Sequence, residues 1–120
     1  MATVLVVEDK DSLRAMLEEM LRAEGWSVVG VGSGSAAVER LRAGEKIDLV
    51  LTDVVMPGMN GRGLVERLAG IRPAIKSLYM SGYTDDDIIR RGFIEPSKSF
   101  LQKPFTSEAL LQTVRKVLDE

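Results

Sequence analysis

The feature that most constrains the fold is the alternation of short apolar runs with helix-like patterns along the 120 residues. The first run, TVLVV at Thr3–Val7, is continuous in β-branched and aliphatic residues, which is typical of strands covered on both faces. Similar runs occupy residues 28–31, 47–52, 77–80 and 100–101. Because a helix-length segment separates each run from the next, we expect five strands of one parallel sheet.

Between these runs, apolar residues recur at helical spacing. Asp11 or Ser12, Ser33 and Thr106 are candidate helix caps, and Gly25 and Gly44 are candidate stops. Further helices are predicted over residues 61–68 and 84–91, whereas residues 92–99 carry weak signals for either element. The apolar faces of the first and last helices comprise Leu13, Met16, Leu17, Met20, Leu21, Leu110, Leu111, Val114, Val117 and Leu118. The fold class is therefore α/β: one doubly wound domain over residues 1–120, with helices on both faces of the sheet.

The composition excludes several kinds of site. The chain has no histidine and no cysteine, so metal sites built on imidazole or thiolate and Ser-His or Cys-His nucleophile pairs are ruled out. A bound metal must accept oxygen ligands, as Mg²⁺, Mn²⁺ and Ca²⁺ do. A net charge of −2, spread along the chain, provides no basic patch for nucleic acid. The apolar runs are too short for a bilayer and the N-terminus lacks a signal-peptide pattern, so a cytoplasmic protein with no membrane contact is expected.

Polar residues follow four of the predicted strands. Glu8 and Asp9 follow the first, Asp53 the third, Ser81 the fourth and Lys103 the fifth. The carboxyl ends of parallel strands share one edge of a sheet, where α/β proteins bind ligands, so these side chains should converge. Three clustered acids repel one another unless a cation compensates, which favours Mg²⁺. With the lysine nearby, such a site suits a phosphoryl group, and an aspartate there can act as a nucleophile that forms an acyl phosphate.

Each of these residues also has an ordinary structural explanation. The acidic pair could be solvated before a helix, Asp53 could belong to a turn, and Ser81 could be a loop hydroxyl. Lys103 beside an apolar strand has fewer such explanations. Their joint placement at successive strand ends favours a functional site.

Four segments carry a resemblance that extends along the whole chain: the Glu8-Asp9 pair, DVVMPGMNG from Asp53, MSGY from Met80 and KPF from Lys103. They resemble the receiver domains of two-component response regulators, which implies a flavodoxin-like (CheY-like) fold. The resemblance implies that Asp53 accepts a phosphoryl group from a phosphohistidine on a histidine kinase or histidine phosphotransfer protein. It also implies Mg²⁺, or Mn²⁺ in its place, on Glu8, Asp9, Asp53 and the backbone carbonyl of Val55, with Lys103 and Ser81 contacting the phosphoryl oxygens.

The same resemblance implies a switch. In the family Ser81 would move toward the phosphate and an aromatic residue, here Phe100 in place of the more familiar tyrosine, would turn inward. The Lys103-Pro104 bond would be cis.

The segments LYMSGYT and SFLQKPF are similar to receivers fused to hybrid sensor histidine kinases. A monomer or weak dimer is expected.

Three apolar residues border the predicted site: Leu13, Met16 and Phe105. We expect the donor's helix to dock there, although all three could instead be core residues.

The resemblance also places Val55 and Tyr83 beside the path of the water that hydrolyses the aspartyl phosphate. Neither is suited to orient that water, which predicts a long-lived phosphoryl group.

Two other functions remain open. One is an interaction module of the same fold that takes no phosphate, against which the complete set of site residues argues. The other is a Mg²⁺-dependent phosphohydrolase that uses an aspartyl phosphate. Such enzymes typically carry a general-acid aspartate two residues after the nucleophile, where this chain has Val55. The domain is expected to promote its own phosphorylation and dephosphorylation without turning over a separate substrate.

Overall fold

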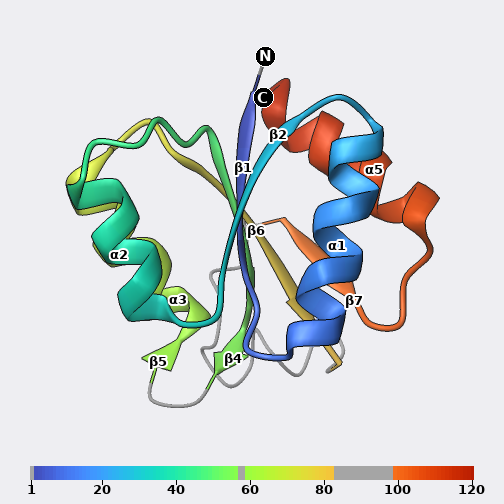
Figure 1. Ribbon diagram of the computed structural model, residues 1–120, viewed down its shortest axis with the longest axis horizontal. Helices are drawn as coiled ribbons and strands as arrows, with labels where there is room; N and C mark the ends of the chain where they lie inside the picture. Colours follow the sequence, from blue (N-terminus) through green and yellow to red (C-terminus); the bar gives the residue numbers. More distant parts are fainter. Residues whose placement is uncertain (1, 57–58, 83–98) are drawn as a thin grey trace.

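The computed structural model describes residues 2–56, 59–82 and 99–120, and within them five parallel strands form one sheet (Figure 1). The spatial order is β2-β1-β3-β6-β7, with bounds Ser27–Val31, Thr3–Val7, Leu49–Asp53, Lys76–Ser81 and Phe100–Gln102. The chain first moves outward from β1 to β2 and then returns to β3 on the other side of β1. In such an order the ligand crevice lies at the carboxyl ends of β1 and β3.

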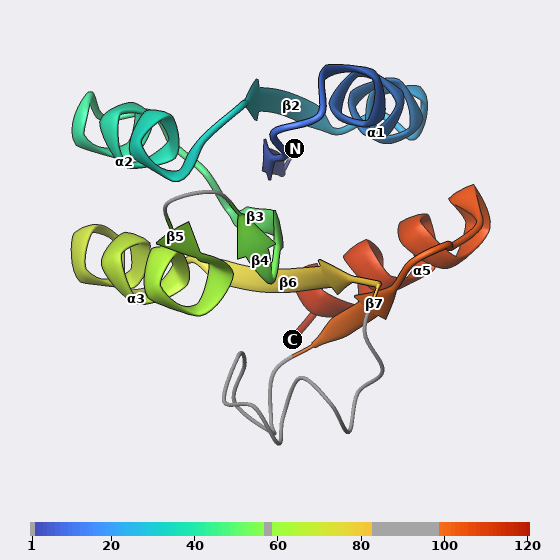
Figure 2. The same ribbon diagram turned by 90° about the horizontal axis from the view of Figure 1, so that it is seen from below.

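Helices cover both faces of the sheet. Helices α1 (Asp11–Ala23) and α5 (Ser107–Leu118) lie on one face, and α2 (Gly34–Arg42) and α3 (Gly61–Ile71) lie on the other (Figures 1 and 2). The predicted doubly wound α/β architecture is therefore confirmed for the described part of the chain. The helix predicted over residues 84–91 and most of the weak segment, residues 92–98, lie outside the described residues.

The central strand β1 packs against both helical layers. Val4 and Val6 belong to the cluster under α1 and α5, whereas Leu5 and Val7 belong to the cluster under α2 and α3. All four side chains are fully buried. This alternation follows from the two-residue period of a strand. Burial of each such side chain contributes about 1.5–3 kcal/mol, so the strand end that follows is rigidly supported.

The helix ends match the predicted caps in two of three cases. Ser33 Oγ accepts a hydrogen bond from the Ala36 amide at 3.2 Å, and Thr106 Oγ1 accepts one from the Ala109 amide at 3.0 Å. Gly25 and Gly44 follow α1 and α2 with φ angles of +101° and +93°, which glycine adopts readily.

The predicted cap of the first helix was wrong. Lys10 occupies the N-cap position and its side chain makes no cap bond. Asp11 is already the first helical residue, and its carboxylate accepts a hydrogen bond from Arg14 Nη2 at 2.7 Å. A side chain used for that contact in the first turn is not acting as the N-cap.

Several element boundaries differ from the sequence predictions, most of them by one residue. The third strand begins at Leu49 rather than Ile47 and includes Asp53, while α3 continues to Ile71. A short antiparallel pair, β4 (Val55–Met56) and β5 (Met59–Asn60), follows β3 where only a loop was predicted. Two-residue strands are too short to leave a period in the sequence. Among the described helices, none is long and apolar enough to cross a membrane.

Candidate phosphoacceptor and metal site

A crevice of about 240 Å³ opens at the carboxyl ends of the strands, where the sequence predicted a site. Its lining comprises Glu8, Asp9, Lys10, Asp53, Val55, Met80, Ser81, Gly82 and Lys103. All five residues that the sequence placed at the strand ends are among them. The chain positions them by extending four parallel strands to one edge, with each polar residue at or just beyond the last buried position.

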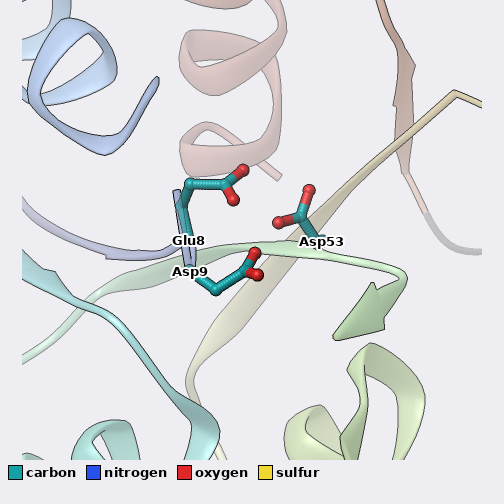
Figure 3. A group of neighbouring side chains, drawn as sticks. All are labelled: Glu8, Asp9 and Asp53. Atoms are coloured by element: carbon teal, nitrogen blue, oxygen red, sulfur yellow. The ribbon is translucent and has the colours of Figure 1, made fainter. Parts of the chain in front are cut away.

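The three carboxylates lie close together. Oxygens of Glu8, Asp9 and Asp53, one from each residue, all lie within 4.8 Å of one another. Figure 3 shows Glu8 and Asp9 after the end of β1, with their carboxylates directed toward the same space as that of Asp53. Glu8 and Asp53 are 1% and 6% exposed, whereas Asp9 is exposed. Buried acids this close require positive charge to compensate their mutual repulsion.

Lys103 supplies part of that charge. Its Nζ donates to Asp53 Oδ1 at 2.6 Å and to Glu8 Oε1 at 3.4 Å. Burial alone would lower the pKa of Lys103, but the hydrogen bond and charge of Asp53, with Glu8 adding to them, outweigh burial and raise the pKa. The ammonium therefore keeps its charge at neutral pH.

The donor set fits a hard divalent cation. When the three acids are ionised, one ammonium leaves two negative charges uncompensated, and the two positive charges of Mg²⁺ would balance them. The side-chain donors of the cluster are carboxylate oxygens, the ligands that Mg²⁺ and Mn²⁺ prefer. The open crevice also leaves space for water and for a phosphoryl oxygen, which Mg²⁺ commonly retains as ligands.

Strand β7 contributes residues to the core, and Lys103, which follows it, lines the crevice. The Lys103 amide donates to the Ser81 carbonyl at 2.7 Å, which continues the pairing of β6 with β7, and the Lys103-Pro104 peptide is cis. Phe100 pairs in register with Tyr79 and is partly buried against the core under α2 and α3. The predicted hydroxyl and the predicted switch aromatic therefore lie on neighbouring strands.

Sequence reasoning missed the tight support behind Asp53. The Gly61 amide donates to the Val54 carbonyl at 2.6 Å, and a Cβ at Gly61 would lie 2.3 Å from the Asp53 carbonyl oxygen. Only glycine allows this approach. The glycine eight residues after Asp53 was visible in the sequence, but its contact with the backbone of Asp53 involves the unpredicted β4–β5 pair that precedes it.

Lys10 was also missed. It lines the crevice, and its amide donates to Glu8 Oε2 at 3.1 Å. This bond holds one carboxylate oxygen of Glu8, while Lys103 contacts the other oxygen, Oε1. Every residue except proline has a backbone amide, so the residue type at position 10 carried no signal for this bond.

A second, apolar hollow of about 230 Å³ lies next to the crevice. It is lined by Leu13, Met16, Met20, Lys103, Pro104 and Phe105. Leu13 and Phe105 are partly buried and pack against the core under α1 and α5, whereas Met16 is 45% exposed. Of the three residues predicted for docking, Met16 is thus the one that the core does not cover.

The family model described as "Response regulator receiver domain" matches residues 4–115. The chain is 38% identical over 120 residues to the sensor kinase CckA of Brucella abortus, covering 99% of the chain but only 13% of the kinase. It is 31% identical over 118 residues to the response regulator receiver protein CpdR of Brucella abortus, covering 98% of each. A crystal structure of a response regulator receiver protein from Sinorhizobium medicae superposes with a TM-score of 0.86 at 31% identity, covering 98% of this chain and 94% of that one.

Proposed function

The chain belongs to the response regulator receiver domains, the phosphoacceptor switches of two-component signalling, and on that premise we propose that Asp53 is its phosphoacceptor. The observation that carries this proposal is the position of Asp53. Its carboxylate is buried at the end of β3, with two further acids on one side and the Lys103 ammonium at 2.6 Å. Of the three acids, Asp53 makes the shortest contact with this cation.

The reaction follows from the chemistry of an acyl phosphate. A carboxylate oxygen of Asp53 attacks the phosphorus of a phosphohistidine, and the bond between phosphorus and the imidazole nitrogen breaks. The electron pair stays on the imidazole, which then takes up a proton. The product is an aspartyl phosphate, and the chain has no histidine that could be the donor.

We assign the metal to Glu8, Asp9, Asp53 and the backbone carbonyl of Val55, with Mg²⁺ as the ion and Mn²⁺ as its substitute. When bound, the ion would neutralise charge on the phosphoryl oxygens. The chain's own contribution is the fixed placement of the ligands, supported by the Lys10 amide on Glu8 and by the tight packing of Gly61 on the backbone of Asp53.

Lys103 and Ser81 are assigned to the phosphoryl group itself. Lys103 already faces Asp53, so its ammonium can neutralise phosphoryl oxygens without movement of the main chain. Ser81 lines the crevice from the end of β6. Movement of Ser81 toward the phosphate would be accompanied by inward rotation of Phe100, which is partly buried on the neighbouring strand.

The donor is proposed to be a histidine kinase or histidine phosphotransfer protein that docks on Leu13, Met16 and Phe105. The apolar hollow beside the crevice supports this assignment, because a helix seated there would bring its histidine close to Asp53. The similarity to the sensor kinase CckA supports a receiver of the kind found in hybrid kinases. The single receiver domain over residues 1–120 and a monomeric or weakly dimeric state are part of the same proposal.

Intact-mass measurement after incubation with acetyl phosphate and Mg²⁺ tests the function. The parent should gain one phosphoryl group, and EDTA should prevent the gain. No gain in the parent at saturating Mg²⁺ would instead favour an interaction module that takes no phosphate. Steady release of inorganic phosphate from small phosphomonoesters would favour a phosphohydrolase.

A further inference from the structure

We propose that Arg14 is a positioning residue for the metal site and acts through the backbone of Glu8. The proposal rests on the function proposed above and adds a residue that lies outside the crevice lining. Arg14 lies in the first turn of α1, and its side chain reaches back toward the end of β1.

The guanidinium joins the two sides of the β1–α1 connection. Arg14 Nη1 donates to the Glu8 carbonyl at 2.8 Å, and Nη2 donates to Asp11 Oδ1 at 2.7 Å. The Arg14 side chain is 22% exposed, whereas that of Asp11 is 90% exposed. Arg14 is therefore the less exposed partner of the pair, and its contact with Glu8 lies in the more protected part of this connection.

The Glu8 carbonyl belongs to the peptide that leads into Asp9, so its orientation affects both acids. The Glu8 amide is held by the Val31 carbonyl at 3.1 Å, and the Glu8 carboxylate is held by the Lys10 amide and by Lys103. Arg14 holds the carbonyl. The peptide plane between two of the proposed metal ligands, Glu8 and Asp9, is thereby held by the Arg14 guanidinium.

The neighbouring strand leaves space for this arrangement. Gly32 follows β2, and a Cβ at Gly32 would lie 3.2 Å from Arg14 Nη1. A side chain there would press on the guanidinium just where it donates to Glu8. Gly32 and Arg14 thus fit together around one hydrogen bond.

Charge and positioning predict opposite effects of removing Arg14. A guanidinium near a cation site repels the ion, so loss of its charge alone would tighten Mg²⁺ binding. Loss of a residue that orients metal ligands weakens metal binding, typically by about 10- to 100-fold for outer partners of the ligands. The direction of the change therefore identifies the role.

The experiment is calorimetric titration of Mg²⁺ into the parent, Arg14→Gln and Arg14→Lys, with acetyl-phosphate labelling rates measured across a Mg²⁺ series. We expect Arg14→Gln to bind Mg²⁺ about tenfold more weakly. Its labelling rate at saturating Mg²⁺ should approach that of the parent. Arg14→Lys should lose less affinity for Mg²⁺, because its ammonium is still a donor that can reach toward the Glu8 carbonyl.

The matched control is Arg22→Gln, which makes the same charge change two turns along the same helix. Arg22 is 55% exposed and contacts Glu18 and the Val28 carbonyl, none of which lines the crevice. It should leave Mg²⁺ affinity near that of the parent. Thermal melts of all variants in EDTA separate a folding defect from a change at the site.

Unchanged or tighter Mg²⁺ binding in Arg14→Gln would overturn the positioning role while leaving the proposed function intact. A labelling rate that stays low at saturating Mg²⁺ would also overturn it, because the defect would then lie beyond metal binding. A parent that binds no Mg²⁺ would overturn both this inference and the metal assignment on which it rests.

Discussion

At the scale of single residues, Lys103 contacts two of the carboxylates that we assign to a metal ion. Lys103 contacts Asp53 and Glu8, two of the three acids whose oxygens lie within 4.8 Å of one another. The raised pKa of Lys103 keeps it cationic, so it repels a metal ion while it is suited to attract phosphoryl oxygens. The two positive groups are thus expected to be complementary in the phosphorylated state and antagonistic before it.

Lys103→Met should therefore keep or raise Mg²⁺ affinity and slow labelling by acetyl phosphate. The first effect follows because the variant removes a cation from among the metal ligands. The second follows because the phosphoryl oxygens lose a neutralising partner. Titration calorimetry and labelling rates measure the two effects, with Lys116→Met on the exposed side of α5 as the control. A large loss of Mg²⁺ binding with the fold intact would contradict the assignment.

The lifetime of the phosphoryl group also depends on single side chains. Val55 is 50% exposed at the crevice and has no group to orient a water molecule, while Tyr83 lies outside the described residues. We expect the Val55→Asn, Tyr83→Glu double variant to lose its phosphoryl group faster than the parent, because positioning of the water limits hydrolysis. The measurement is the decay of phosphorylated mass in excess Mg²⁺ after donor removal. Equal decay rates in the parent and the double variant would show that these two positions do not set the lifetime of the phosphoryl group.

At the scale of elements, helix α1 presents two different surfaces near the site. Its first turn carries Arg14, which contacts the backbone of Glu8, and the neighbouring face carries Leu13 and Met16 beside the apolar hollow. On the proposed assignments, substitutions on this one helix should affect metal binding and donor docking separately.

Met16→Asp should slow transfer from a histidine donor and spare labelling by acetyl phosphate. An aspartate in the hollow opposes burial of an apolar helix face, whereas a small donor needs no docking surface. Single-turnover transfer from a phosphorylated histidine phosphotransfer protein measures the first rate. Ile71→Asp, at the exposed end of α3, is the matched control. Equal losses with both donors would indicate a folding defect.

Features of the helices and strands were predictable where they depend on residues close together in the sequence. Ser33 and Thr106 cap their helices because a hydroxyl three residues before a free amide is a short-range arrangement. The Lys10 cap position and the β4–β5 pair were missed, since neither depends on a recognisable side-chain pattern. The role of Arg14 was missed because the direction of a long side chain depends on space left by Gly32 in another element.

At the scale of the whole molecule, the site depends on parallel pairing. Glu8, Asp53 and Lys103 are far apart in sequence and meet because β1, β3 and β7 end at one edge of the sheet. That convergence was predictable from parallel pairing and from the residues at the strand ends, before any side-chain geometry was known. The individual contact distances were not, because they depend on the loops that follow each strand.

A ligand that binds only the folded site should stabilise the entire domain. Mg²⁺ at about 100 times its Kd should add about 2.7 kcal/mol to the free energy of unfolding, and EDTA should remove this gain. Thermal unfolding in MgCl₂ measures the effect, with NaCl at equal ionic strength as the control for screening. Asp9→Asn should reduce the gain, because it removes one negative ligand. Equal shifts in both salts would contradict a specific site.

The most direct test of the central claim is to locate the phosphoryl group. After labelling with acetyl phosphate and Mg²⁺, borohydride reduces an aspartyl phosphate to homoserine, which peptide mapping identifies by position. We predict that the converted residue is Asp53 and that Asp53→Asn gains no phosphoryl mass. Homoserine at position 9, hydroxynorvaline at position 8 from a reduced glutamyl phosphate, or full labelling of Asp53→Asn would contradict the assignment of Asp53 as the phosphoacceptor.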